Sequence, residues 1–130
     1  MEKLVLTIAA IMFSAGMAAA ADPLEGTWRT TADDNGNSGL IQVAPCGATL
    51  CGTLVKSYDS SGKEMASKNI GRNIISETKN TGGGSYKGKV YSPDRDKTYS
   101  SKLKLSGDTL KVSGCVFGIC RDGGTWKKVR

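Results

Sequence analysis

The sequence predicts an all-β protein, a small antiparallel up-and-down β-barrel. From Gly26 onward, short strand-like runs alternate with turn-forming residues roughly every 8 to 12 residues, and no window shows an apolar helical stripe. The chain also contains 17 glycines, which disfavour long helices. Without a helix to cover it, an antiparallel sheet buries its apolar face and removes its edges by closing on itself. A two-sheet β-sandwich is the alternative architecture.

Residues 1–21 have the pattern of a cleaved secretory signal peptide. Lys3 lies in a short polar start, the apolar run Leu4–Phe13 follows, and the alanine-rich stretch Met17–Ala21 ends the segment. An apolar run of about a dozen residues is too short for a bilayer, which needs roughly 20 helical residues, but suits a signal peptide. We expect cleavage after Ala20 or Ala21 and a periplasmic or secreted protein, exported by a Gram-negative-type route, with no transmembrane segment left after cleavage.

Residues 22–130 are expected to form a single β-barrel domain, because a chain of about this length builds one hydrophobic core. About eight short strands fit into it. Turn formers such as Asp33–Asn37, Asn80–Gly84 and Ser92–Lys97 separate the runs. The predicted strands are, in order, Gly26–Thr31, Leu40–Ala44, Leu50–Lys56, Ile70–Thr78, Tyr86–Tyr91, Thr98–Leu105, Thr109–Gly114 and Gly124–Val129.

Period-2 alternation assigns an inward and an outward face, most clearly on both sides of the turn at Pro93. Apolar and small side chains alternate there with lysines, which places the lysines outside. The residues expected to bound a cavity are Trp28, Ile41, Val43, Val90, Tyr99, Leu103, Leu105 and Leu110. Gly88 and Ser101 also fall on the inward face, and such small groups favour some empty volume.

Four cysteines form two pairs of equal spacing, Cys46 with Cys51 and Cys115 with Cys120. Four cysteines allow three connectivities. Each pair has strand-like flanks and can face across a hairpin with a four-residue loop, where opposed Cα atoms lie about 4.5 to 5.5 Å apart. We therefore expect two local disulfides in an oxidising compartment. Two alternatives are cross-links between the two loops and a metal site of four thiolates. The spacing within each pair is longer than the C-x2-C spacing usual in metal sites, which disfavours the second.

Histidine is absent from the sequence. This excludes Ser-His and Cys-His hydrolases, His-ligated zinc sites and a general base with an unperturbed pKa near neutrality. We therefore predict no catalytic residues, no cofactor and no metal, and a protein that is not an enzyme.

One acidic segment has the oxygen spacing of a calcium loop, at Asp33, Asn35 and Asn37. The sixth position of that loop is Ser38 instead of glycine, and the twelfth is Ala44 instead of an acid. The segment is therefore predicted to be a turn built from Asp, Asn and Gly.

The formal net charge is +6, and the leader does not change it because Glu2 and Lys3 cancel. Outward lysines on adjacent strands can meet an anionic envelope surface, such as lipopolysaccharide or anionic lipid. Nucleic acid is not expected as a partner, since exposed aromatic residues for base stacking do not interleave with these lysines.

The order of short motifs along residues 22–130 resembles an exported bacterial family, the domain-of-unknown-function family 2147. The motifs that carry the resemblance are Asp22–Trp28, Cys46-Gly47, Leu50–Gly52, Gly88–Pro93, Lys97–Tyr99, Gly114-Cys115, Cys120-Arg121 and Thr125-Trp126. The resemblance implies a lipocalin-like barrel without an assigned reaction. It also implies a role for Trp28 within Gly26-Thr27-Trp28: its indole plugs one end of the barrel against a cation of the last strand, for which Lys128 is the positional match.

Two functions follow as hypotheses. The first is an exported, non-enzymatic barrel that binds a small apolar or amphipathic ligand. The second is an envelope or secreted interaction protein that uses its cationic face on anionic surfaces. Salt separates them, because surface binding weakens at moderate ionic strength while an apolar cavity ligand is hardly affected.

Overall fold

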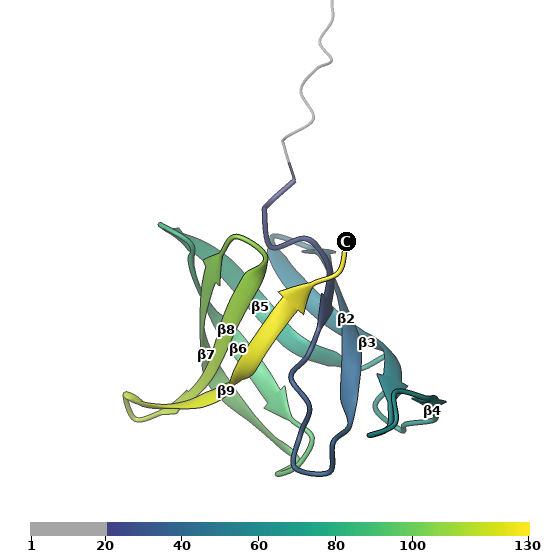
Figure 1. The fold of residues 1–130 in the computed structure, drawn as a ribbon. Helices are drawn as coiled ribbons and strands as arrows, with labels where there is room; N and C mark the ends of the chain where they lie inside the picture. The colour runs from purple at the N-terminus through teal and green to yellow at the C-terminus, as the bar shows by residue number, and fades with distance from the viewer. Residues whose placement is uncertain (1–20) are drawn as a thin grey trace, which may run out of the picture.

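The computed structural model describes residues 21–130 and shows a closed antiparallel barrel (Figure 1). Nine strands form one sheet: β1 (Gly26–Arg29), β2 (Ser38–Cys46), β3 (Thr49–Tyr58), β4 (Glu64–Met65), β5 (Asn73–Gly82), β6 (Ser85–Ser92), β7 (Lys97–Ser106), β8 (Thr109–Val116) and β9 (Ile119–Lys128). The predicted signal peptide lies, apart from Ala21, outside the described residues. Within residues 21–130, no helix is long and apolar enough to cross a membrane.

The ring closes because β2 pairs with both β1 and β3, while β1 also pairs with β9. Strand β4 pairs only with β3, so eight strands form the barrel itself. The all-β, lipocalin-like barrel predicted from the sequence is therefore confirmed, and the sandwich alternative is wrong.

The largest difference from the predicted strands is in the middle of the chain. Strand β5 begins at Asn73 instead of Ile70, because residues 69–72 form turns that bond back to β3: the Gly71 N–H donates to the Leu54 carbonyl at 2.8 Å, and the Arg72 carbonyl accepts from the Leu54 N–H at 2.9 Å. Register shifts interrupt the pairing of β5 with both of its neighbours. A strand that carries bulges loses the regular alternation that a sequence pattern detects.

Alternating connections divide the barrel into two ends, visible in Figure 1. The β2–β3, β5–β6 and β7–β8 turns lie at one end, together with the N-terminal segment from Asp22 and the C-terminus. The β1–β2, β6–β7 and β8–β9 connections and the β3–β5 segment lie at the other end. We call the first the closed end, because the buried Trp28 lies there, and the second the open end, because a cavity opens there.

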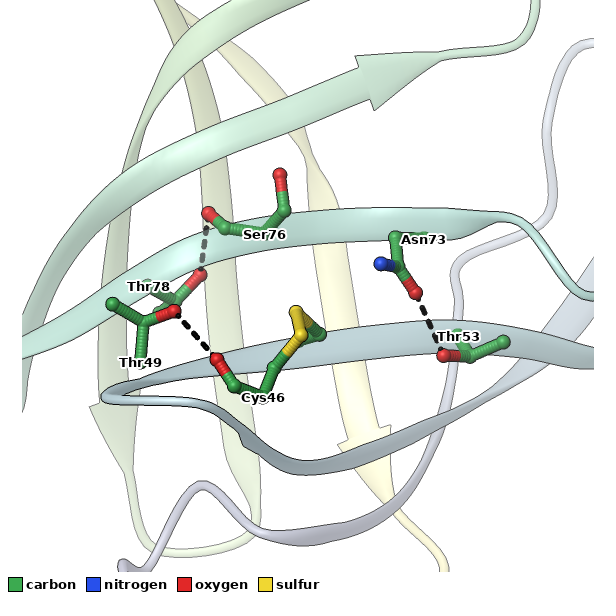
Figure 2. The surroundings of a disulfide bond; sticks show 7 residues. Cys46, Thr49, Thr53, Asn73, Ser76 and Thr78 are labelled. Carbon is green, nitrogen blue, oxygen red and sulfur yellow. Dashed lines mark hydrogen bonds between the residues drawn. A yellow bond between two sulfur atoms is a disulfide. The ribbon is translucent and has the colours of Figure 1, made fainter.

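Each of the two disulfides crosses one hairpin, and the two hairpins lie at opposite ends of the barrel. Cys46–Cys51 joins β2 to β3 at the closed end, with Cα atoms 5.5 Å apart, and Cys115–Cys120 joins β8 to β9 at the open end, with Cα atoms 4.0 Å apart. Figure 2 shows the first bridge, beside which the Thr49 hydroxyl donates to the Cys46 carbonyl at 3.3 Å.

The expected four-residue loops are wrong in both hairpins. The strands extend farther and turn over two residues, because Cys46 pairs with Thr49 and Val116 pairs with Ile119. Cys115 and Cys120 are directly opposed in register, whereas Cys51 is opposed to Ala44, so the closed-end bridge is diagonal.

Candidate functional site

A cavity of about 1080 Å³ opens at the open end of the barrel. Its apolar lining comes from strands on all sides of the barrel: Ile41, Leu54, Ile74, Val90, Val112 and Trp126. Polar and charged side chains of the β1–β2 and β6–β7 connections and of the start of β9 surround the mouth: Asp33, Asn35, Asp94, Arg95, Arg121 and Asp122. An apolar interior with charged groups at its entrance suits an amphipathic small molecule.

The opposite end is sealed by Trp28, which is 0% exposed. Its indole Nε1–H donates to the Leu24 carbonyl at 2.9 Å. The Lys128 ammonium lies 5.4 Å from the centre of the indole and donates to the Pro23 carbonyl at 2.9 Å. Gly26 permits this packing, since a Cβ there would meet the Arg130 carbonyl at 2.6 Å. The two residues named for the barrel plug therefore lie in contact at this end.

A polar lock fixes the N-terminal segment over the closed end. The Tyr86 hydroxyl donates to the Asp22 carboxylate at 2.5 Å, and the Asn80 amide donates to the same carboxylate at 3.1 Å. The pKa of Tyr86 is raised by its burial and by the bond to Asp22. Burial acts to raise the pKa of Asp22, but the bonds from Tyr86, the Leu24 N–H and Asn80 together lower it. The pair is therefore held as neutral phenol and ionised carboxylate.

The residues predicted to bound the cavity are divided between two levels of the barrel. Ile41, Val90 and Tyr99 line the cavity. The other five do not line it and instead pack in or against the hydrophobic core below: Trp28, Val43, Leu103, Leu105 and Leu110. Alternation gives the face of a strand but not the height along the barrel axis. This reasoning missed the open-end connections and the rest of the apolar lining, namely Leu54, Ile74, Val112 and Trp126.

Small residues do stand side by side in one part of the wall, where Gly88, Ser101 and Gly114 are paired across β6, β7 and β8. Gly88 is required by its neighbour, because a Cβ there would lie 2.6 to 2.8 Å from the backbone of the β5 bulge at Ser76–Thr78. A Cβ on Gly114 meets only Tyr99, at 3.4 Å or more, and Gly114 lines the cavity. Ser101 is 3% exposed and its hydroxyl has no partner among the described residues.

The segment with calcium-loop spacing is a turn, as predicted. The Asp33 carboxylate accepts the N–H groups of Asn35 and Asn37, both at 2.9 Å, so it is occupied by its own backbone. On the β6–β7 side of the mouth, Tyr91 donates to Asp96 at 2.7 Å and carries the Arg72 guanidinium 3.7 Å from its ring centre. The bond to Asp96 and partial burial raise the pKa of Tyr91.

A family model described as "Uncharacterized protein conserved in bacteria (DUF2147)" matches residues 26–128, so the chain belongs to this family. No curated protein matches the sequence. Among solved structures, the chain is similar to protein HP1028 of Helicobacter pylori, described as belonging to the lipocalin family, with 19% identity, 85% of each chain covered and a TM-score of 0.64. At this identity the likeness shows the fold alone.

Proposed function

We propose that this member of the DUF2147 family is a non-enzymatic binding protein that takes up one small apolar or amphipathic ligand at the open end of its barrel. One observation supports it above the others: the 1080 Å³ cavity lies over a packed core and has polar and charged side chains of the open end along its border. Pockets of roughly 300 to 1,000 Å³ with apolar walls and a few polar groups are typical of small-molecule sites.

Export to the periplasm or the exterior is part of this proposal. Two disulfides are consistent with an oxidising compartment. Processing after Ala20 or Ala21 would leave Asp22 at or beside the new N-terminus, where it joins the polar lock with Tyr86.

Titration with an environment-sensitive apolar dye tests the cavity. The unsubstituted protein is expected to bind the dye, and Gly114→Leu is expected to weaken binding at least tenfold, because the new side chain enters the cavity from a position with an ordinary φ and room for a Cβ. Ser100→Leu is the matched control, since Ser100 is exposed on the neighbouring strand β7. Dye affinity should change little between low and moderate salt.

Two results would contradict the proposal. The first is absence of dye uptake by the folded, unsubstituted protein. The second is equal binding by Gly114→Leu and Ser100→Leu, both shown to be folded by circular dichroism. Val90→Phe provides a second blocking variant from β6, should Gly114→Leu fail to fold.

A further inference from the structure

Six lysines gather on the outer wall of four adjacent strands: Lys79, Lys87, Lys89, Lys102, Lys104 and Lys111. We call this wall the lysine face. All six are exposed, and the register places several of them directly opposite one another. Lys87 is opposed to Lys79 on β5 and to Lys102 on β7, while Lys104 is opposed to Lys111 on β8.

This arrangement costs folding free energy, because like charges directly opposite on adjacent strands repel. The structure records no ion pair between any of these lysines and another described residue, whereas Lys56, on the next strand β3, pairs with Glu64 at 3.9 Å. A shallow hollow in the same wall is lined by Lys87, Lys102, Lys104 and Lys111, with the hydroxyls of Thr81, Ser85 and Ser113 between them. The Lys104 ammonium donates to the Gly83 carbonyl at 2.7 Å, and none of the four lysines has an ion-pair partner among the described residues. Cations without a counter-charge, beside hydroxyl groups, are suited to phosphate-bearing groups.

An apolar tip continues from the lysine face. The β8–β9 hairpin ends in Val116, Phe117 and Ile119, which are 47%, 99% and 72% exposed. Phe117 has a φ of 52°, a conformation unfavourable for a bulky residue, and the Cys115–Cys120 bridge closes the base of this turn. Figure 1 shows the hairpin projecting beyond the barrel wall. Lys111 lies on the same strand, about 20 Å from Phe117 at strand rise.

We propose that the lysine face and the apolar tip together dock the protein on an anionic lipid bilayer. The lysines meet lipid phosphates, and the tip enters the boundary between headgroups and acyl chains, as amphipathic anchors do. Nucleic acid fits less well, because the aromatic side chain in the lysine-lined hollow, Tyr86, is 1% exposed and offers no stacking surface. Val116, Phe117 and Ile119 also line the cavity, whereas none of the six lysines does, so the lysine face tests the docking separately from the cavity.

Co-sedimentation with vesicles tests the docking. The purified protein should bind phosphatidylcholine vesicles that contain about one-third phosphatidylglycerol at low salt, and should be released as salt screens the lysines. Lys87→Gln combined with Lys102→Gln should weaken binding about 30-fold, at about 1 kcal/mol per lysine near the surface. The matched control is Lys63→Gln with Lys68→Gln, two exposed residues of the β3–β5 connection, which removes the same charge and should leave affinity nearly unchanged.

Phe117→Asn tests the tip separately. Asparagine tolerates positive φ and gives an Asn-Gly turn, so the variant should be at least as stable as the unsubstituted protein. Its vesicle affinity should nevertheless fall about tenfold, because an aromatic side chain is lost from the membrane interface.

Several outcomes would overturn the docking. Equal weakening by the two lysine pairs would show that only net charge matters, and equal binding to pure phosphatidylcholine vesicles would remove the role of the lysine face. Unchanged vesicle binding by Phe117→Asn would remove the role of the tip. Binding of a short RNA as tightly as anionic vesicles, under the same salt, would assign the face to nucleic acid instead.

Discussion

The two ends of the barrel differ in how fully their side chains are buried and hydrogen-bonded. At the closed end, Trp28 and Tyr86 are 0% and 1% exposed, and the polar atoms of both side chains have partners. At the open end, Phe117 is 99% exposed and the Asn69 amide oxygen, at the cavity wall, is buried without a partner among the described residues. Fully paired groups hold one structure, whereas unfilled volume and unpaired groups are what a ligand can use. The paired and fully buried groups are thus concentrated at one end of the sheet, and the proposed binding site lies at the other.

The largest expected effect is at the plug. Trp28→Ala should lower the free energy of unfolding by about 3 to 5 kcal/mol, because it opens a large void in a fully packed region. Trp126→Ala is the matched change at the cavity and should cost less, since Trp126 already borders empty volume. Denaturant titration measures both.

If Trp28→Ala and Trp126→Ala lower the free energy of unfolding by the same amount, the proposed difference in packing between the two ends is wrong. Dye binding gives a second reading of the same pair, because Trp126→Ala alters the cavity wall while Trp28→Ala does not touch it.

The two disulfides close loops of equal length, one at each end of the barrel. Their removal therefore compares the two ends at the same expected change in chain entropy. Replacing Cys46 and Cys51 by serine should cost about 2 kcal/mol of stability, as a loop of about six residues predicts, and replacing Cys115 and Cys120 should cost about the same. Thermal or denaturant unfolding under oxidising conditions measures the two costs.

The two disulfide removals should loosen different parts of the structure even though they lower the free energy of unfolding by a similar amount. Without Cys115–Cys120, faster amide exchange is expected only near the β8–β9 tip, because that hairpin extends beyond the barrel. Loss of the whole fold in either variant would show that the bridge does more than fasten a hairpin end.

The sequence predicts the closed end more completely than the open end. At the closed end, the resemblance carried by Gly26-Thr27-Trp28 implies the plug of Trp28 and Lys128, and these two residues do lie in contact there. The alternation on both sides of Pro93 depends on a simple period, and it gives the inward and outward faces of the strands but not their height in the barrel. The cavity depends instead on where β5 bulges and on how high each strand sits in the ring. That is why Leu103 and Leu110 have the expected inward face but pack in the core below the cavity. Register shifts of this kind come from tertiary pairing and leave no periodic signal.

The smallest effect concerns the polar lock and depends on pH. Tyr86→Phe should cost about 1 kcal/mol near pH 7, because it removes the hydroxyl that donates to the Asp22 carboxylate. The bound carboxylate has a lowered pKa, so its contribution is fully present above the ordinary pKa of about 4 and is lost as the pH falls through the lowered value. The raised pKa of Tyr86 keeps its proton in place to beyond pH 10, so the contribution should stay constant across neutral pH. The stability difference between the unsubstituted protein and Tyr86→Phe, measured by denaturant at several pH values, should therefore shrink only in acid.

Tyr91→Phe is the control at the open end. The Tyr91 hydroxyl also donates to a carboxylate, but that carboxylate belongs to Asp96 in an exposed turn. A larger loss for Tyr91→Phe than for Tyr86→Phe, or a Tyr86→Phe effect that does not change between pH 7 and strong acid, would show that the lock does not hold the closed end.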